Sequence, residues 1–294
     1  MQSFFQPFRS LRLFGKVIFA ISMAWIILVF GLSWMYLQRL THTDCPPGLS
    51  VVPGFQSILL PSEEGIDLPA WWHLTKNNAV VILLGGHRSN RDNMLEEAQY
   101  LARHGFGVLL PASRGCSGAS SSLGILETRD LDAALLFLHK EAPTVWIGAA
   151  GFSAGGAAVI RQSVSRPEIQ AVAAIGNYAN LWREIRGNNP APLTLEWQFQ
   201  HAIGAILWLQ FGHPPAVISP IDDLPRLAPR PVLLIHGERE IARTQGYDQF
   251  TAARKPKELF VVEGADHGEY LQSAPKEYLQ KILEFFETSR GNSK

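Results

Sequence analysis

Short apolar runs alternate with stretches of helical spacing along the chain from residue 55 onward. Near-continuous apolar runs of strand length, typical of strands buried on both faces of a sheet, occupy residues 79–85, 106–111, 144–149, 169–175, 231–236 and 258–263. Two earlier runs, which a turn-rich segment separates, predict strands at 55–60 and 68–74. Apolar residues three and four positions apart predict helices over 94–102, 131–138 and 278–286.

This order of elements predicts an α/β fold with a mostly parallel central sheet and helices on both faces. Parallel neighbours need crossover connections, which run right-handed. Ligands in such sheets bind beyond the carboxyl ends of the strands. We therefore expect the chemistry of this chain in the loops that follow its strands.

Residues 178–217 interrupt the alternation, because this segment is too long for one crossover. It is rich in aromatic and apolar residues, with three tryptophans at 182, 197 and 208. One interpretation is a helical excursion that packs a small core of its own. The other, which we favour, is a small helical cap that covers a site and touches an apolar substrate.

The N-terminal part has a different pattern. Residues 17–37 contain no charged side chain, and about 20 apolar residues are enough to cross the hydrocarbon core of a bilayer. The segment therefore predicts one transmembrane helix, with residues 38–54 as a linker and residues 55–290 as the folded domain. A cleaved signal peptide is the alternative, but its apolar core would be shorter, and no small-x-small cleavage site follows Leu37.

Basic residues set the expected orientation of this helix. Arg9, Arg12 and Lys16 precede the span, whereas only Arg39 follows it closely. Positive charge stays on the cytoplasmic side, so residues 1–16 are predicted to be cytoplasmic. The domain is then expected on the far side, in the periplasm, cell exterior or lumen.

Composition narrows the partners. The formal net charge is zero, so electrostatics give no reason to expect a nucleic-acid partner. The two cysteines, Cys45 and Cys116, are too few for a disulfide framework and lack metal-ligand spacing. They could pair in an oxidising compartment, but we favour a thiol in a polar loop and a small packed thiol.

A single serine stands among small residues in the sequence AAGFSAGGAA at 149–158. Ser153 follows the predicted strand 144–149 and precedes a helix-compatible run, so it lies on a sharp turn at the carboxyl edge of the sheet. Side chains at Gly151 and Gly155 would collide with this turn. The pattern G-x-S-x-G is that of a nucleophile elbow; a glycine-rich turn capped by serine is the alternative.

A serine hydroxyl needs a base to take its proton, and an acid should precede that base in the chain. His267 follows the strand 258–263 in the turn GADHGEY, at the same edge of the sheet as Ser153. The sequence GERE follows the strand 231–236 and offers Glu238 and Glu240 as the acid.

With these residues in place, the chain resembles the α/β-hydrolase-fold serine hydrolases of the esterase and lipase-like branch. The resemblance covers about residues 55–288, and the family pattern H-G-x-x-D corresponds to residues 236–240. It implies Glu240 as the acid, although the family usually has aspartate there, and Glu238 remains the rival. It also implies an oxyanion hole formed by the backbone N–H groups of His87 and Ala154.

Two departures from the family pattern accompany this resemblance. Gly85 and Gly86 stand where the family often has His-Gly, which leaves a backbone donor in place. Ala112 replaces the aspartate of D-x-R-G in the next loop, which puts the rigidity of that loop in question.

The resemblance implies a serine hydrolase that cleaves an acyl ester without a metal or organic cofactor. The apolar segment 178–217 and the membrane helix 17–37 favour a small lipophilic acyl substrate. Two alternatives remain open: an amide or thioester hydrolase with the same catalytic residues, and a non-catalytic hydrolase fold used for binding.

Overall fold

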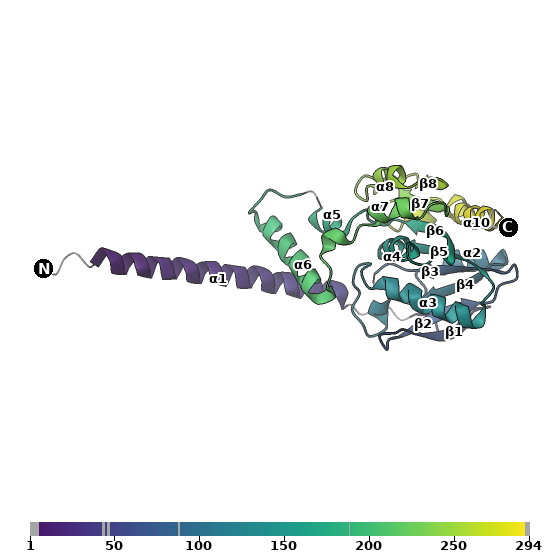
Figure 1. Ribbon diagram of the computed structural model, residues 1–294, viewed down its shortest axis with the longest axis horizontal. Coiled ribbons are helices and arrows are strands. Elements are labelled where there is room, and N and C mark those ends of the chain that lie inside the picture. Colours follow the sequence, from purple (N-terminus) through teal and green to yellow (C-terminus); the bar gives the residue numbers. More distant parts are fainter. Residues whose placement is uncertain (1–5, 43–44, 46–47, 88, 188, 292–294) are drawn as a thin grey trace.

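A long helix and an α/β body make up the computed structural model, which describes residues 6–42, 45, 48–87, 89–187 and 189–291 (Figure 1). Helix α1 (Gln6–Thr41) projects from the body, and the chain ends on the opposite side of the sheet. Within the described residues, eight strands form one sheet in the order β1-β2-β4-β3-β5-β6-β7-β8.

The strands lie where the apolar runs predict them. They are β1 (Gln56–Pro61), β2 (Asp67–His73), β3 (Ala79–Leu84), β4 (Gly107–Pro111), β5 (Trp146–Phe152), β6 (Ile169–Ile175), β7 (Val232–Gly237) and β8 (Lys257–Val262). Strand β2 pairs antiparallel with β1 and β4, and the pairs from β4 to β8 are parallel. Every residue of β3, β4 and β7 is buried, which is why their sequences show no polar alternation.

Helices cover both faces of this sheet, as predicted. On one face, α2 (Leu95–Arg103) and α10 (Pro275–Gly291) pack in a core with α9 (Tyr270–Ser273). On the other face, α3 (Glu127–Glu141) and α4 (Ala154–Ser163) pack in a second core with α8 (Gly246–Ala252). The short elements η1 (Arg114–Cys116), η2 (Pro215–Val217), α7 (Pro220–Asp223) and η3 (Leu224–Arg226) complete the connections.

The interrupting segment 178–217 contains α5 (Leu181–Arg186) and α6 (Leu195–Phe211). Thr194 caps the start of α6 by accepting a hydrogen bond from the Trp197 amide at 3.2 Å. The core of this segment includes α1, because Leu37 packs in one buried cluster with Ile203 and Leu207 of α6. Figure 1 shows α6 crossing the end of α1 that adjoins the body.

Helix α1 has the composition of a membrane-crossing element. Among the described residues, the helical segment Arg12–Thr41 is long and apolar enough to span a bilayer, although a signal sequence shares these properties. Nearly all of it is exposed, which separates it from the core helix of a soluble protein. The helix continues through Thr41 into the predicted linker, in which residues 43–44 and 46–47 lie outside the described part of the chain.

The interpretation that both thiols stay unpaired is wrong. Cys45 and Cys116 form a disulfide, with their Cα atoms 5.5 Å apart, within the usual range for such bonds. Sequence spacing could not reveal the pair, because the two residues come together only through the docking of α1. Further bonds hold the same junction: the Ser121 amide donates to Thr41 O at 3.0 Å, and Ser120 Oγ lies 2.5 Å from His42 Nε2. The end of α1 is thus attached to the loop after β4.

Candidate active site

Ser153 occupies the turn between β5 and α4 in a strained backbone conformation, with φ 54° and ψ −119°. A β-carbon at Gly151 would lie 2.4 Å from the Gly155 carbonyl, and one at Gly155 would lie 2.3 Å from Leu84 O. These contacts explain why the turn requires glycine at both positions. Although Ser153 is the N-cap residue of α4, its hydroxyl makes no capping hydrogen bond, which argues against a serine kept only as a helix cap.

The hydroxyl of Ser153 faces His267 instead. Ser153 Oγ lies 3.1 Å from His267 Nε2, and His267 Nδ1 lies 2.6 Å from Glu240 Oε2. With a proton on Nδ1, the imidazole donates to the carboxylate and accepts from the serine hydroxyl. The three side chains follow β5, β7 and β8 at the carboxyl edge of the sheet, so residues far apart in the chain form one hydrogen-bonded relay.

Glu240 is fully buried and receives several donors. The Gly237 amide donates to its Oε1 at 3.0 Å, and the Tyr270 hydroxyl donates to the same oxygen. Burial alone would raise the pKa of Glu240, but the hydrogen bonds from His267, Gly237 and Tyr270 outweigh it and hold the pKa below its usual value. The carboxylate is therefore charged at neutral pH.

Glu238, the rival acid, is not part of this relay. Its Oε2 accepts a hydrogen bond from the Gly264 amide at 2.9 Å, and its side chain is exposed. The structure therefore brings Glu240, and not Glu238, to the imidazole of His267.

Tyr270 is a residue of the site that the sequence analysis missed. Burial raises the pKa of its phenol, and the neighbouring Glu240 carboxylate raises it further, so the hydroxyl stays protonated and acts as a donor. Its oxygen leaves no room at Gly176, where a β-carbon would lie 2.2 Å away. The sequence signal was the tyrosine three positions after His267, at the start of α9.

A ring contact also positions the imidazole. Phe152, the residue before Ser153, lies with its ring centroid 4.8 Å from that of His267, at an interplanar angle of 31°. The side chain that ends β5 therefore supports the histidine that faces the next residue.

The two residues expected to supply an oxyanion hole lie near Ser153. Ala154 begins α4, where the helix dipole favours negative charge. His87 lies in the loop after β3, and a β-carbon at the adjacent Gly86 would lie 3.3 Å from Ser153 Cβ. Glycine at 86 therefore lets this loop pass close to the serine. His87 and Ala154 line the same cavity as Ser153.

That cavity has a volume of about 340 Å³, which is within the range of small-molecule sites. Ser153 and His267 lie in its wall, and the remaining lining is mostly apolar: Tyr36, Leu40, Leu123, Leu181, Ile185 and Ile203. A larger cavity of about 740 Å³ lies beside α5, but neither Ser153 nor His267 lines it. We therefore assign the smaller cavity to the site.

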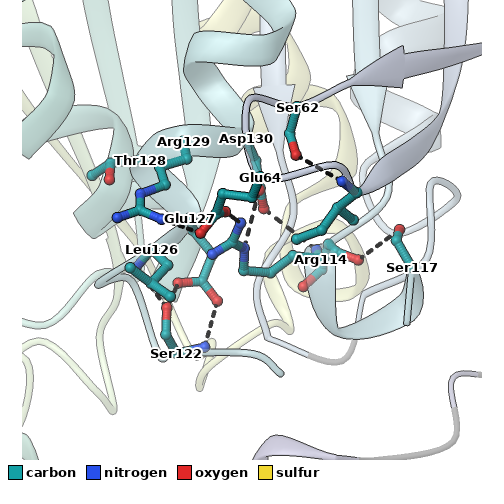
Figure 2. A network of polar contacts seen from close by, with 12 residues as sticks. Ser62, Glu64, Arg114, Ser117, Ser122, Leu126, Glu127, Thr128, Arg129 and Asp130 are labelled. Atoms are coloured by element: carbon teal, nitrogen blue, oxygen red, sulfur yellow. Dashed lines mark hydrogen bonds and ion pairs between the residues drawn. The ribbon is translucent and has the colours of Figure 1, made fainter. Parts of the chain in front are cut away.

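The loop after β4 is held by a buried ion-pair network (Figure 2). The guanidinium of Arg114, almost fully buried, donates from Nε to Asp130 Oδ1 at 3.2 Å and from Nη2 to Glu64. Glu127 accepts hydrogen bonds from the Ser122 amide at 2.9 Å and from the Ser122 hydroxyl. These partners offset part of the cost of burying the Arg114 guanidinium.

This network resolves the question that Ala112 raised. The loop is held without the aspartate of the family pattern, because Arg114 pairs with Asp130 and Glu64, and Glu127 of α3 accepts a hydrogen bond from the Ser122 amide. The Tyr178 hydroxyl adds a further bond by donating to Leu123 O at 2.6 Å. Leu123 is thereby held in the cavity wall beside Ser153.

Within the described residues, no group of three or more histidine, cysteine, aspartate or glutamate side chains is arranged to hold a metal ion.

Comparisons with known proteins match most of the chain. Residues 51–281 match the profile of a family described as the alpha/beta hydrolase family. An esterase of Pyrococcus furiosus, Pf2001, is 21% identical with a TM-score of 0.65, covering 84% of this chain and 99% of that protein. The alpha/beta hydrolase GrgF of a Penicillium species is 15% identical with a TM-score of 0.63, covering 81% of this chain and 99% of that protein.

The protein PA2218 of Pseudomonas aeruginosa is similar in both sequence and structure. A segment of 61 residues is 39% identical, but it spans only 21% of this chain and 16% of that protein. The solved structure of PA2218 covers 84% of this chain and 99% of its own, with 21% identity and a TM-score of 0.60. The solved structures are 15–21% identical to this chain, and at that level the similarity shows a shared fold. This confirms the predicted fold class.

Proposed function

Since the chain belongs to the alpha/beta hydrolase family, we propose that it is a membrane-anchored serine hydrolase that cleaves an acyl ester. Ser153 is the nucleophile, His267 is the general base and Glu240 orients the imidazole. The relay from Ser153 Oγ through His267 to Glu240, with separations of 3.1 and 2.6 Å, is the observation that carries the proposal.

The proposed reaction follows from the positions of these groups. Ser153 Oγ attacks the ester carbonyl carbon as His267 Nε2 takes the hydroxyl proton, and Glu240 stabilises the imidazolium that forms. The backbone N–H groups of Ala154 and His87 stabilise the tetrahedral oxyanion; one such donor contributes about 10²–10³ in rate. His267 returns the proton to the leaving alcohol, and the same relay then activates water to hydrolyse the acyl-enzyme.

Two observations favour an ester over the alternatives. Similar structures include an esterase, and the cavity beside Ser153 is lined mostly by apolar side chains, which suit an acyl chain. Against a purely binding role stands Glu240, a buried carboxylate whose pKa burial alone would raise and whose hydrogen-bond donors hold the pKa below its usual value. A fold used only for binding has no need of this arrangement.

We also propose that α1 is an uncleaved anchor, with the N-terminus in the cytoplasm and the domain on the opposite side. A cleaved signal peptide would not be expected to pack into the mature protein, whereas Leu37 is fully buried against α6. The disulfide between Cys45 and Cys116 fits an oxidising compartment on the domain side.

A fluorophosphonate probe tests the enzymatic proposal. We expect it to label the full-length protein and to leave Ser153→Ala unlabelled. Absence of labelling in the wild type, or labelling that persists in the variant, would overturn the proposal. Hydrolysis of p-nitrophenyl esters in preference to aminoacyl p-nitroanilides or acyl thioesters is expected, and the opposite preference would favour the alternative substrates.

A further inference from the structure

The cavity beside Ser153 is built partly from the membrane helix. Tyr36 and Leu40 of α1 line it together with Ile203 of α6 and Ile185 of α5. A helix that served only as a tether would have no reason to line the same cavity as Ser153. The apolar wall of the site and the apolar span of α1 are thus continuous.

The contact between α1 and the domain is fixed rather than incidental. Leu37 is fully buried between the helices, and the rings of Tyr36 and Phe199 meet edge-on with centroids 5.7 Å apart. The disulfide from Cys45 and the bond from Ser121 to Thr41 O hold the end of α1 against the body. The wall that α1 contributes therefore keeps its place beside the site.

The length of the span places this wall at the membrane surface. Residues 17–37 at about 1.5 Å per residue are about 30 Å long, the thickness of a hydrocarbon core. Tyr36 then lies at the interface, where tyrosine is enriched, and Leu40 lies about one turn beyond it. The cavity is consequently adjacent to the headgroup region of one leaflet.

Helix α6 runs beside the outer part of the same span and exposes apolar side chains. Leu195 and Leu209 are 61% and 81% exposed, and Trp208 is also exposed. The polar Gln198 near its start is paired at both ends: its Oε1 accepts from Trp25 Nε1 at 2.7 Å, and its Nε2 donates to Leu193 O at 2.9 Å. Such pairing is what a hydrocarbon environment requires of a polar group.

We propose that α1 and α6 form a passage from the leaflet to Ser153, and that the substrate is an ester of a lipid resident in the bilayer. This inference rests on the proposed serine hydrolase activity. An acyl chain that moves from the leaflet into this cavity passes from one apolar environment to another. The transfer therefore carries no free-energy cost for exposing the chain to water. The ester carbonyl, at the polar end of the chain, then meets Ser153 near the membrane surface.

The first experiment compares two routes of delivery. The full-length protein is reconstituted into phosphatidylcholine vesicles that contain a long-chain 4-methylumbelliferyl ester, or is mixed with separate vesicles that carry the ester. We expect hydrolysis at least tenfold faster when protein and ester share a bilayer. Equal rates would overturn the passage, because they would mean that the ester reaches the site through water.

The second experiment fills the wall that α1 contributes. Leu40→Trp should lower the ratio of long-chain to acetyl ester kcat/KM by about tenfold. The matched control is Met35→Trp, on an exposed part of the same helix, which should leave that ratio unchanged. A ratio unaffected by Leu40→Trp, or lowered equally by both variants, would contradict the inference.

These outcomes are distinct from failure of the proposed activity. If the wild type labels with fluorophosphonate and hydrolyses the acetyl ester, the enzyme proposal stands whatever the long-chain ester shows. If neither occurs, the activity and the passage that rests on it both fail.

Discussion

Replacing Tyr270 with phenylalanine tests how the acid of the relay is held. The Tyr270 hydroxyl and the Gly237 amide both donate to Oε1 of Glu240, while His267 contacts Oε2. Removing the hydroxyl leaves a buried carboxylate with one donor fewer and freer to rotate away from the imidazole.

The expected magnitude follows from this geometry. A hydrogen bond to a buried charged group contributes about 1.5–3 kcal/mol, so Tyr270→Phe should lower the free energy of unfolding by about 2 kcal/mol. If about 1.4 kcal/mol of that loss also destabilises the transition state for attack by Ser153, the rate of attack falls about tenfold. The second-order rate of fluorophosphonate labelling, measured on folded full-length protein in detergent, reports this rate.

Tyr278→Phe is the matched control. The hydroxyl of Tyr278 donates to a different buried carboxylate, Glu97, at 2.8 Å, and its ring stacks on that of Tyr270 with centroids 5.6 Å apart. Burial raises the pKa of Glu97, and we expect Tyr278→Phe to lower the free energy of unfolding by about 1 kcal/mol. The labelling rate should not change. Equal effects of the two substitutions on this rate, or no effect of Tyr270→Phe, would refute the assignment of Tyr270 as a positioning residue.

Four further predictions concern the acid of the relay, the turn at Ser153, the disulfide and His236. Glu240→Gln should slow labelling about 10⁴-fold by disturbing the tautomer and charge of the relay, whereas Glu238→Gln should stay within about twofold; the reverse order would transfer the role to Glu238. Gly155→Ala places a β-carbon 2.3 Å from a backbone oxygen and should cost about 3 kcal/mol or more in thermal unfolding, so wild-type stability would contradict the packing described for the turn. Cys45→Ser opens a disulfide with a sequence separation of 71 and should lower stability by about 4 kcal/mol; reductant should destabilise the wild type equally, and indifference to both would count against the bond. Burial lowers the pKa of His236 to about 4 from 6.5, so the unfolded chain binds a proton first as the pH falls; stability should decline by roughly 3 kcal/mol between pH 6.5 and 4, and a His236→Gln variant with the same decline would refute this.

The strands of the fold could be predicted because their burial leaves a local trace. Strand β3 is covered on both faces, so its sequence is an unbroken apolar run, and the same holds for β4 and β7. The turn at Ser153 is also local, since the glycines that it requires lie within two residues. Once a parallel sheet is inferred, the loops after β5, β7 and β8 must share one edge, so the partners of Ser153 could be sought there.

Contacts between distant segments left no such trace. Nothing near Leu37 or Ile203 indicates that α1 packs against α6, because an apolar residue on a predicted membrane helix is equally suited to lipid. The disulfide depended on the same docking and was misjudged for that reason. Tyr270 was missed because a tyrosine near the start of a short helix is ordinary, and its role depends on an acid 30 residues earlier in the chain.

Trapping the acyl-enzyme shows whether Ser153 is the nucleophile. Full-length protein is mixed with a p-nitrophenyl ester, quenched in acid within the first turnover, digested and examined by mass spectrometry. We expect the peptide containing Ser153 to gain the mass of the acyl group in step with a burst of p-nitrophenol. An unmodified Ser153 peptide during turnover, or an acyl group on another residue, would contradict it.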